Sequence, residues 1–146
     1  MHDFLSPYII AAAASWVVAQ GLKYVVASIK GRKLNSLRQL YLSGSMPSAH
    51  SASAIALLVV IGCKDGIGSG LFGLALLFAA VVMYDAVMVR RSSGEQGNAL
   101  VELMRELKRK STTPIRVAKG HTPAEVLGGI VVGLIVGIVV YFATLG

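Results

Sequence analysis

Charged residues are absent from four long stretches of this 146-residue chain. The stretches run from Phe4 to Leu22, Met46 to Cys63, Gly66 to Tyr84 and Val126 to Gly146. About 20 apolar residues of helix cross the roughly 30 Å core of a bilayer, and all four stretches lie near that length. We therefore predict an all-α, polytopic integral membrane helical bundle of about four transmembrane helices, folded as a single membrane-embedded domain over residues 1–146.

Composition agrees with this pattern, because 55% of the residues are hydrophobic and only 14% are charged. Soluble domains carry about a quarter charged residues. The first stretch is expected to remain in the protein as a helix, since Met1-His2-Asp3 provide no positive n-region for a signal peptide. Cys63 lies in the second stretch and is expected to pack there as a small apolar residue.

Positive charge is concentrated in two segments that alternating helices would place on one side. Of the 14 Lys and Arg residues, five lie between Lys23 and Met46, eight between Arg90 and His121, and Lys64 alone lies opposite. Cytoplasmic loops are enriched in Lys and Arg, so both segments are predicted on the cytoplasmic face. The net charge of +7 then reflects topology rather than binding to nucleic acid. Basic residues that bind a substrate would produce the same bias, and this alternative stays open.

The second basic segment contains a helical pattern from Asn98 to Lys110. Its apolar residues are Ala99, Leu100, Leu103, Met104 and Leu107. Acidic and basic residues occupy much of the rest, which is typical of an amphipathic interfacial helix lying at the membrane surface. A solvated helix packed on the bundle would show the same pattern.

The second and fourth predicted helices begin on the basic side with similar sequences. Gly44–His50 reads GSMPSAH, and Gly120–Glu125 reads GHTPAE. Each has a proline in the first turn, where its missing N–H costs least. Each start therefore presents free backbone N–H groups and the positive end of a helix dipole, which together favour anions.

Small residues indicate that these two helices can approach each other closely. The fourth carries Gly129, Gly133 and Gly137, and the second carries Ser48, Ala52 and Ala56 at the same spacing. Such stripes allow membrane helices to pack closely, which would bring His50 and His121 toward a common site. The glycine stripe could instead serve a homodimer or pack on the first helix.

Five further ionisable residues on this side are candidates for a site: Lys23, Asp85, Arg90, Arg91 and Glu125. Asp85 falls inside the end of the third helix, where a carboxylate is costly unless it is paired. The arginines and Lys23 could equally anchor helix ends at the interface. Glu125 also fits a capping box that starts at Thr122.

Three motifs in order resemble the divergent PAP2 family, which is related to type 2 phosphatidic acid phosphatases and vanadium-dependent haloperoxidases. The first is Met46–Ala52, MPSAHSA. The second combines Tyr84–Ala86, Val89–Arg91 and Gly94–Gln96, and the third is Gly120–Val126, GHTPAEV. The resemblance extends from about Gln20 to the C-terminus.

The match to the wider superfamily's motifs, K-x6-R-P, P-S-G-H and S-R-x5-H-x3-D, is partial. Pro47, Ser48 and His50 fit the second, with Ala49 in place of glycine. His121 and Glu125 fit the core of the third, with glutamate in place of aspartate. The first motif and the serine-arginine half of the third have no match, since Arg116 stands one position too close to His121. Arg90 and Arg91, with Lys23, are the expected substitutes for the missing cations.

The resemblance implies phosphoryl transfer without a metal or other cofactor. His121 would attack phosphorus and form a phosphohistidine, while Glu125 would hold its other ring nitrogen. His50 would protonate the leaving alkoxide and then activate water, a role that suits a pKa near 6.5. Ser48, Asp85 and the basic residues would surround the phosphate.

We therefore expect a metal-independent membrane phosphatase that hydrolyses a lipid phosphate or a polyprenyl (pyro)phosphate. Its partners would be that substrate and the bilayer, with no nucleic acid, and homo-oligomers remain possible. A lipid phosphotransferase with another acceptor is one alternative. A non-catalytic protein that binds anionic lipid is another, and it would need positive charge but not the His121 imidazole.

Overall fold

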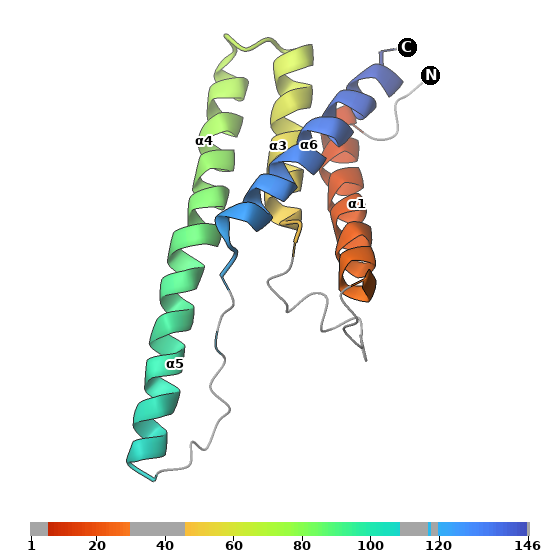
Figure 1. The fold of residues 1–146 in the computed structure, drawn as a ribbon. Helices are drawn as coiled ribbons and strands as arrows, with labels where there is room; N and C mark the ends of the chain where they lie inside the picture. The colour runs from red at the N-terminus through yellow and green to blue at the C-terminus, as the bar shows by residue number, and fades with distance from the viewer. Residues whose placement is uncertain (1–5, 30–45, 109–116, 118–119, 146) are drawn as a thin grey trace.

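A computed structural model describes residues 6–29, 46–108, 117 and 120–145, and within these residues it is helical with no strand. The elements are α1 (Pro7–Ile29), α3 (Ala49–Lys64), α4 (Gly70–Tyr84), the π-helical turn η1 (Asp85–Val89), α5 (Arg90–Glu106) and α6 (Pro123–Ala143). Figure 1 shows them as a helical bundle from which α5 projects. The predicted all-α membrane bundle is confirmed.

Among the described residues, three segments are long and apolar enough to cross a membrane: Pro7–Ile29, Gly70–Glu106 and Pro123–Ala143. The fourth predicted span, α3, is apolar but has only 16 residues. At about 1.5 Å per residue it is shorter than a bilayer core. The chain before it, Met46–Ser48, is not helical, because Ser48 has an extended backbone and acts as the N-cap.

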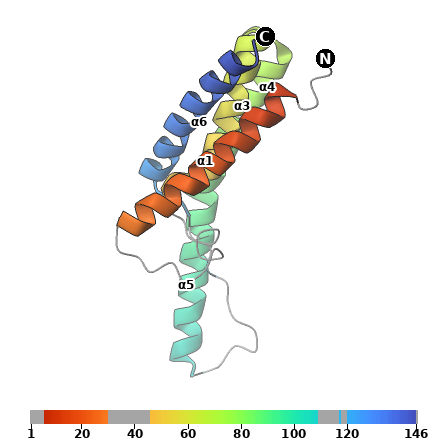
Figure 2. The ribbon, with the colours of Figure 1, turned by 90° about the vertical axis from the view of Figure 1, so that its right-hand side faces the viewer.

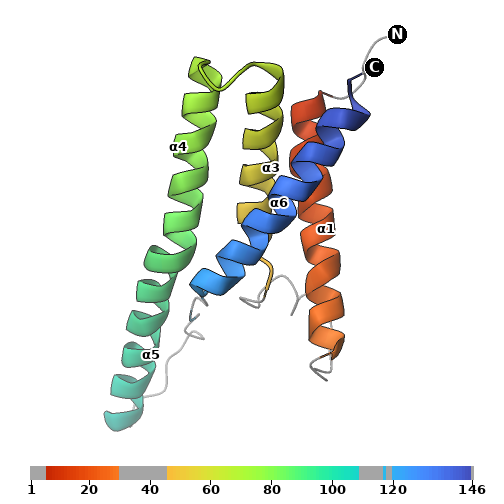
Figure 3. The ribbon, with the colours of Figure 1, turned by 45° about the horizontal axis from the view of Figure 1, so that its top comes forward.

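Successive helices run in alternating directions, so that α1 and α4 descend in Figure 1 while α3 and α6 ascend. The start of α1, the turn between α3 and α4, and the end of α6 therefore meet at one end (Figures 1 and 3). Two hydrogen bonds join them there. Tyr8 Oη donates to Asp65 Oδ2 at 2.7 Å, and Lys64 Nζ donates to the Thr144 carbonyl at 2.9 Å. The starts of α3 and α6 consequently share the opposite end.

The glycine stripe of α6 packs on the small residues of α3, as one of the alternatives predicted. A Cβ atom at Gly129 would lie 2.5 Å from the Ser48 carbonyl oxygen, and one at Gly133 would lie 2.5 Å from that of Ala52. Gly137 meets Ala56 in the same way. Side chains at these positions would force the helices apart, so the stripe serves a contact within the chain.

The first helix contributes a buried face that recurs every four residues: Ala11, Ser15, Ala19, Lys23 and Ala27. This face lies against α3 and α6 (Figure 2). Lys23 is therefore part of the packed face of α1 and is only 5% exposed. It does not anchor the helix from an outward-facing position.

The helix predicted from Asn98 to Lys110 begins earlier and is continuous with the third span. α4, η1 and α5 form one 37-residue helix from Gly70 to Glu106, and they run as one rod in Figures 1 and 2. No proline interrupts this segment, and the π-turn keeps the backbone helical where the sequence changes from apolar to polar. The amphipathic part is thus an extension of α4 rather than a separate element, and Lys110 lies outside the described residues.

Candidate active site

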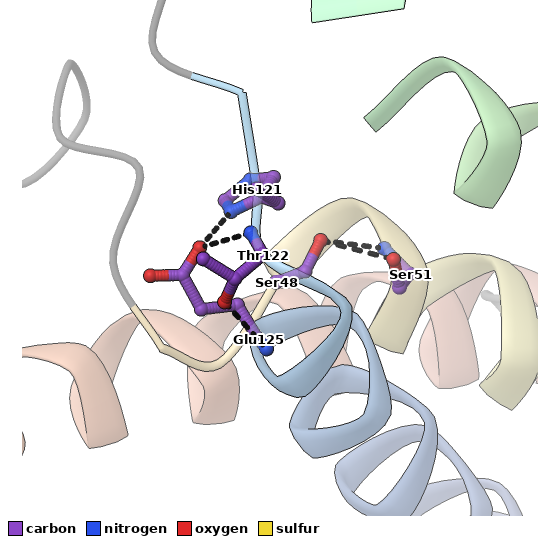
Figure 4. Close-up of polar contacts among 5 residues, drawn as sticks. All are labelled: Ser48, Ser51, His121, Thr122 and Glu125. Atoms are coloured by element: carbon purple, nitrogen blue, oxygen red, sulfur yellow. Dashed lines mark hydrogen bonds and ion pairs between the residues drawn. The ribbon is translucent and has the colours of Figure 1, made fainter. Parts of the chain in front are cut away.

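The imidazole of His121 is held by the first turn of α6. Thr122 is the N-cap: its Oγ1 accepts from the Glu125 N–H at 3.3 Å, and its own N–H donates to Glu125 Oε2 at 2.9 Å. The same carboxylate oxygen lies 3.2 Å from His121 Nδ1 (Figure 4). Glu125 therefore closes the predicted capping box and also orients the histidine, so the two interpretations of this residue are compatible.

This hydrogen bond determines which ring nitrogen faces outward. An ionised carboxylate accepts and cannot donate, so Nδ1 carries the hydrogen in the neutral ring. The unprotonated nitrogen is then Nε2, which has the lone pair. His121 is 9% exposed and the Glu125 side chain 17%, so the pair is largely shielded from solvent.

The start of α3 is joined directly to the start of α6. The Ser48 N–H donates to the Glu125 carbonyl at 2.9 Å. The Ser48 hydroxyl is fully buried, where it accepts from the Ser51 N–H at 3.4 Å and lies 3.0 Å from Ser51 Oγ (Figure 4). Ser48 therefore caps α3 and fixes the spacing of the two helix starts, while its neighbour His50 is exposed.

Both histidines line a single pocket of about 240 Å³. Its walls come from the starts of α3 and α6 and from the junction of α4 with η1 and α5. The lining residues are His50, Val81, Val82, Asp85, Ala86, Arg90 and His121. The structure thus brings together four residues that the sequence singled out, from segments as distant as residues 50 and 121.

The polar side of this pocket carries one fixed cation. Arg90 Nε donates to Asp85 Oδ2 at 2.7 Å, so the carboxylate at the end of the apolar helix is paired. Both side chains remain partly exposed, at 48% and 39%. The guanidinium has five N–H groups, and its bond to Asp85 is its one ion pair among the described residues, which leaves donors there for an anion.

Two of the expected cations lie outside the pocket lining. Arg91 does not line the pocket and pairs with Glu95 at 3.1 Å, with both side chains about two-thirds exposed. Lys23 is buried on α1. Of the three basic residues proposed to replace the missing motifs, only Arg90 lines the pocket with the histidines.

The sequence did not predict two features of the pocket: its apolar side, which includes Val81 and Val82, and the π-turn. Val81 and Val82 stand one turn before Asp85, and helical spacing could have placed them beside it. By contrast, we find no pattern in the sequence that signals a π-turn over Asp85–Val89. The π-turn leaves the Ala86 carbonyl available to the His121 N–H, which donates to it at 2.9 Å.

Within the described ranges, no three His, Cys, Asp or Glu side chains are grouped so that they could hold a metal ion. The donors around the pocket are instead imidazole nitrogens and a guanidinium, with Asp85 paired to Arg90. Such groups suit an oxyanion better than a cation.

Residues 4–136 match the divergent PAP2 family. The uncharacterized membrane protein YuiD of Bacillus subtilis (strain 168) is 30% identical over 149 residues, which cover 92% of this chain and 93% of that protein. No solved structure matches the chain. The family match spans every residue that lines the pocket and also Glu125.

Proposed function

The chain belongs to the divergent PAP2 family of membrane proteins, and on that premise we propose that it is a lipid phosphatase. Its substrate would be a lipid phosphate or a polyprenyl (pyro)phosphate. The reaction would pass through a phosphohistidine on His121 and would require no metal.

One observation carries this proposal. Two histidines, at the starts of α3 and α6, line the same pocket, and among the described residues only His121 of the two is hydrogen-bonded to a carboxylate. The two rings are therefore in different environments. Covalent phosphoryl transfer needs such a difference, because one ring must act as nucleophile and the other as acid and base. A protein that only binds an anionic headgroup has no need of it.

His121 is suited to the nucleophilic role. Glu125 holds Nδ1–H, which leaves the Nε2 lone pair for phosphorus. As Nε2 forms the P–N bond, the ring becomes cationic, and the adjacent carboxylate stabilises that charge. The capping box fixes Glu125 on its other side, so the pair keeps its geometry during the reaction.

His50 is suited to proton transfer. In the first step the bond from phosphorus to its bridging oxygen breaks, and protonated His50 gives its proton to the leaving alkoxide of a monoester or to the leaving phosphate of a pyrophosphate. In the second step neutral His50 takes a proton from water, whose oxygen attacks phosphorus as the P–N bond breaks. Inorganic phosphate leaves, and both histidines return to their starting states. An imidazole suits both roles, because it can give up a proton in one step and take one up in the next.

Arg90 would stabilise the negative charge on the transferring group. Its bond to Asp85 holds the guanidinium at the pocket, and its remaining donors can bind phosphate oxygens. Arg91 and Lys23 would then act from outside the pocket, through the local field. Ser48 would contribute by holding the two helix starts together.

The pocket also suits a substrate with an apolar tail. Val81, Val82 and Ala86 form its apolar wall, and Val81 is 57% exposed on the outer surface of α4. An alkyl chain could leave the pocket along this surface and remain in the bilayer. A water-soluble phosphoester would gain nothing from these contacts.

We place the pocket on the cytoplasmic face because Arg90 and Arg91 lie at that end of the bundle and because the sequence segments that lead into α3 and α6 are rich in Lys and Arg. The test replaces Cys63 with serine and introduces cysteine at Ser93 or, opposite, at Gly68. Both positions are exposed, and a Cβ at Gly68 meets nothing within 4 Å. An impermeant thiol reagent on intact cells should label Gly68→Cys only. Labelling of Ser93→Cys would show that the pocket faces the outside and that the predicted orientation is wrong.

The function is tested by phosphate release from the detergent-purified protein across a panel of lipid phosphates and polyprenyl pyrophosphates. Activity should persist in EDTA and disappear in His121→Ala. Cys63 is exposed at the end of α3 opposite the pocket, and not packed as the sequence predicted, so Cys63→Ser is the matched control and should retain full activity. Lipid binding without release of phosphate by the wild-type protein would favour the non-catalytic alternative.

A further inference from the structure

The π-turn between α4 and α5 exposes a backbone acceptor to another part of the chain. In an α-helix the Ala86 carbonyl would accept from the Arg90 N–H, four residues on. In η1 the Arg90 N–H donates to the Asp85 carbonyl instead. The Ala86 carbonyl accepts from the His121 N–H at 2.9 Å. One extra residue in the helix thus creates a docking point for the backbone of His121.

A second contact fixes Gly120, the residue before His121, against the same helix. We call this continuous helix from Gly70 to Glu106 the rod. A Cβ atom at Gly120 would lie 2.6 Å from the Arg91 nitrogen and 2.7 Å from its Cα. These are backbone atoms of a continuous helix, which cannot move aside as a flexible side chain would. Only glycine allows this approach, and so the chain reaches Arg91 and Ala86 within two consecutive residues.

These two contacts join the halves of the pocket. Asp85 and Arg90 belong to the rod, whereas His121 and Glu125 belong to the start of α6. Within the described residues, α6 has few other contacts with the rod, because its long interface is with α3. The rod also packs on α3 through α4, so α3 sets the overall spacing, and the junction at Gly120 and Ala86 is the direct link between the cation and the nucleophile.

We propose that the π-turn and Gly120 form a clamp that positions His121 relative to Arg90, with Ala86 and Gly120 as positioning residues. The proposal relies on the proposed function for what the two side chains do. The clamp itself rests on backbone contacts. Misplacement of a reacting group by about 1 Å can cost about a hundredfold in rate, so such a clamp would have a large kinetic effect.

Gly120→Ala is the direct test, with Gly97→Ala as its matched control. Gly97 lies on the same rod, but its added Cβ would meet Val117 at 3.3 Å from a side-chain atom and 3.5 Å from the backbone Cα, with no contact below 3 Å. In Gly120→Ala the methyl group must retreat from the helix and lengthen the His121–Ala86 hydrogen bond. We expect kcat to fall about 10- to 100-fold with KM changed less than about threefold. Gly97→Ala should remain within about twofold of wild type.

Deletion of Val87 tests the clamp without a clash. Val87 lies in η1 and does not line the pocket. Its removal makes the existing Arg90–Asp85 backbone bond a normal α-helical one and lets the Arg91 N–H occupy the Ala86 carbonyl. The protein should keep its thermal stability while kcat falls as in Gly120→Ala. A purely structural role of the π-turn would not lower kcat without lowering stability.

The ring nitrogen chemical shifts of His121, from 15N NMR in detergent micelles, provide a readout that does not require turnover. They should change in Gly120→Ala and in the Val87 deletion but not in Gly97→Ala. Unchanged shifts in both clamp variants would overturn the proposal, whatever the activity. If the wild-type protein released no phosphate, the phosphatase assignment would fall, while changed shifts would still support the clamp.

Discussion

The two sides of the pocket are built in different ways. The starts of α3 and α6 are short, locally determined structures in which capping hydrogen bonds from Ser48, Thr122 and Glu125 fix each side chain within one turn. The rod from Gly70 to Glu106 has no such device at the pocket: neither η1 nor α5 has a side-chain cap, and the helix simply continues. The direction in which the rod presents Arg90 to the pocket depends on how this long helix is turned about its own axis.

The two sides of the pocket therefore have different roles in the proposed reaction. The helix starts supply His50, His121 and Glu125, whose roles depend on bonds within a few residues. The rod supplies Arg90, whose position depends on one extra residue in a 37-residue helix. We therefore expect substitutions at the helix starts to act on the bond-breaking step, and substitutions in the rod to act on charge and placement.

The largest effect is expected at the start of α6. His121→Ala removes the nucleophile, so turnover should fall more than about 10⁴-fold, beyond the usual cost of losing an acid or base. Phosphate release measured against Cys63→Ser would show this. Residual activity within tenfold of wild type would rule out covalent catalysis by His121.

Glu125→Gln separates the two roles of this carboxylate. Glutamine can still accept from the Thr122 N–H and close the cap, but a neutral amide cannot stabilise a cationic imidazole. We expect a folded protein with kcat reduced at least about 100-fold. Thermal unfolding and kinetics on the same samples test this. Normal activity with normal stability would mean that Glu125 serves only as a cap.

The rod should show a smaller effect that differs between adjacent arginines. Arg90 lines the pocket and Arg91 pairs with Glu95 outside it. Arg90→Ala should therefore lower kcat/KM about 10- to 100-fold, whereas Arg91→Ala should change it less than about threefold. Arg90→Lys should restore little, because lysine lacks the planar fork. Equal effects of the two alanine substitutions would contradict the placement of Arg90.

The smallest effect on turnover is expected from the loss of a helix cap, and two caps at opposite ends of the bundle can be compared. Ser48 caps α3 beside the pocket, and Ser69 caps α4 at the far end. Either alanine substitution should cost about 1 kcal/mol of stability. Only Ser48→Ala should also reduce kcat, by a few fold, since it loosens the position of His50. A loss above about 100-fold would indicate that Ser48 binds the substrate directly.

The helix starts could be predicted because their signals are local. The first-turn proline and the TPAE capping box of α6 express interactions within a few residues. The predicted first-turn proline of the second helix was wrong, because Pro47 precedes the N-cap Ser48 and lies outside α3. The pairing of α3 with α6 followed from matching small-residue stripes. His50 and His121 could be placed at a common site on that basis alone.

The arrangement of the rod could not be predicted in the same way. Nothing between Tyr84 and Arg91 distinguishes a π-turn from an ordinary helix, since both leave the same residue types helical. The choice depends on a tertiary hydrogen bond, from His121 to Ala86, across 35 positions of the chain. For the same reason the sequence could not separate Arg90 from Arg91, and its pattern predicted a separate amphipathic helix from Asn98 to Lys110, whereas α5 continues α4 and begins at Arg90.

The central claim, a phosphohistidine at His121, is tested most directly by trapping the intermediate. The purified protein would be mixed with a lipid phosphate carrying a radiolabelled phosphoryl group and quenched within one turnover. We predict a phosphoprotein that is labile in acid, stable in base and mapped by mass spectrometry to His121, and that is absent from His121→Ala. Phosphate release by the wild-type protein with no labelled histidine, or with label on another residue, would contradict the account.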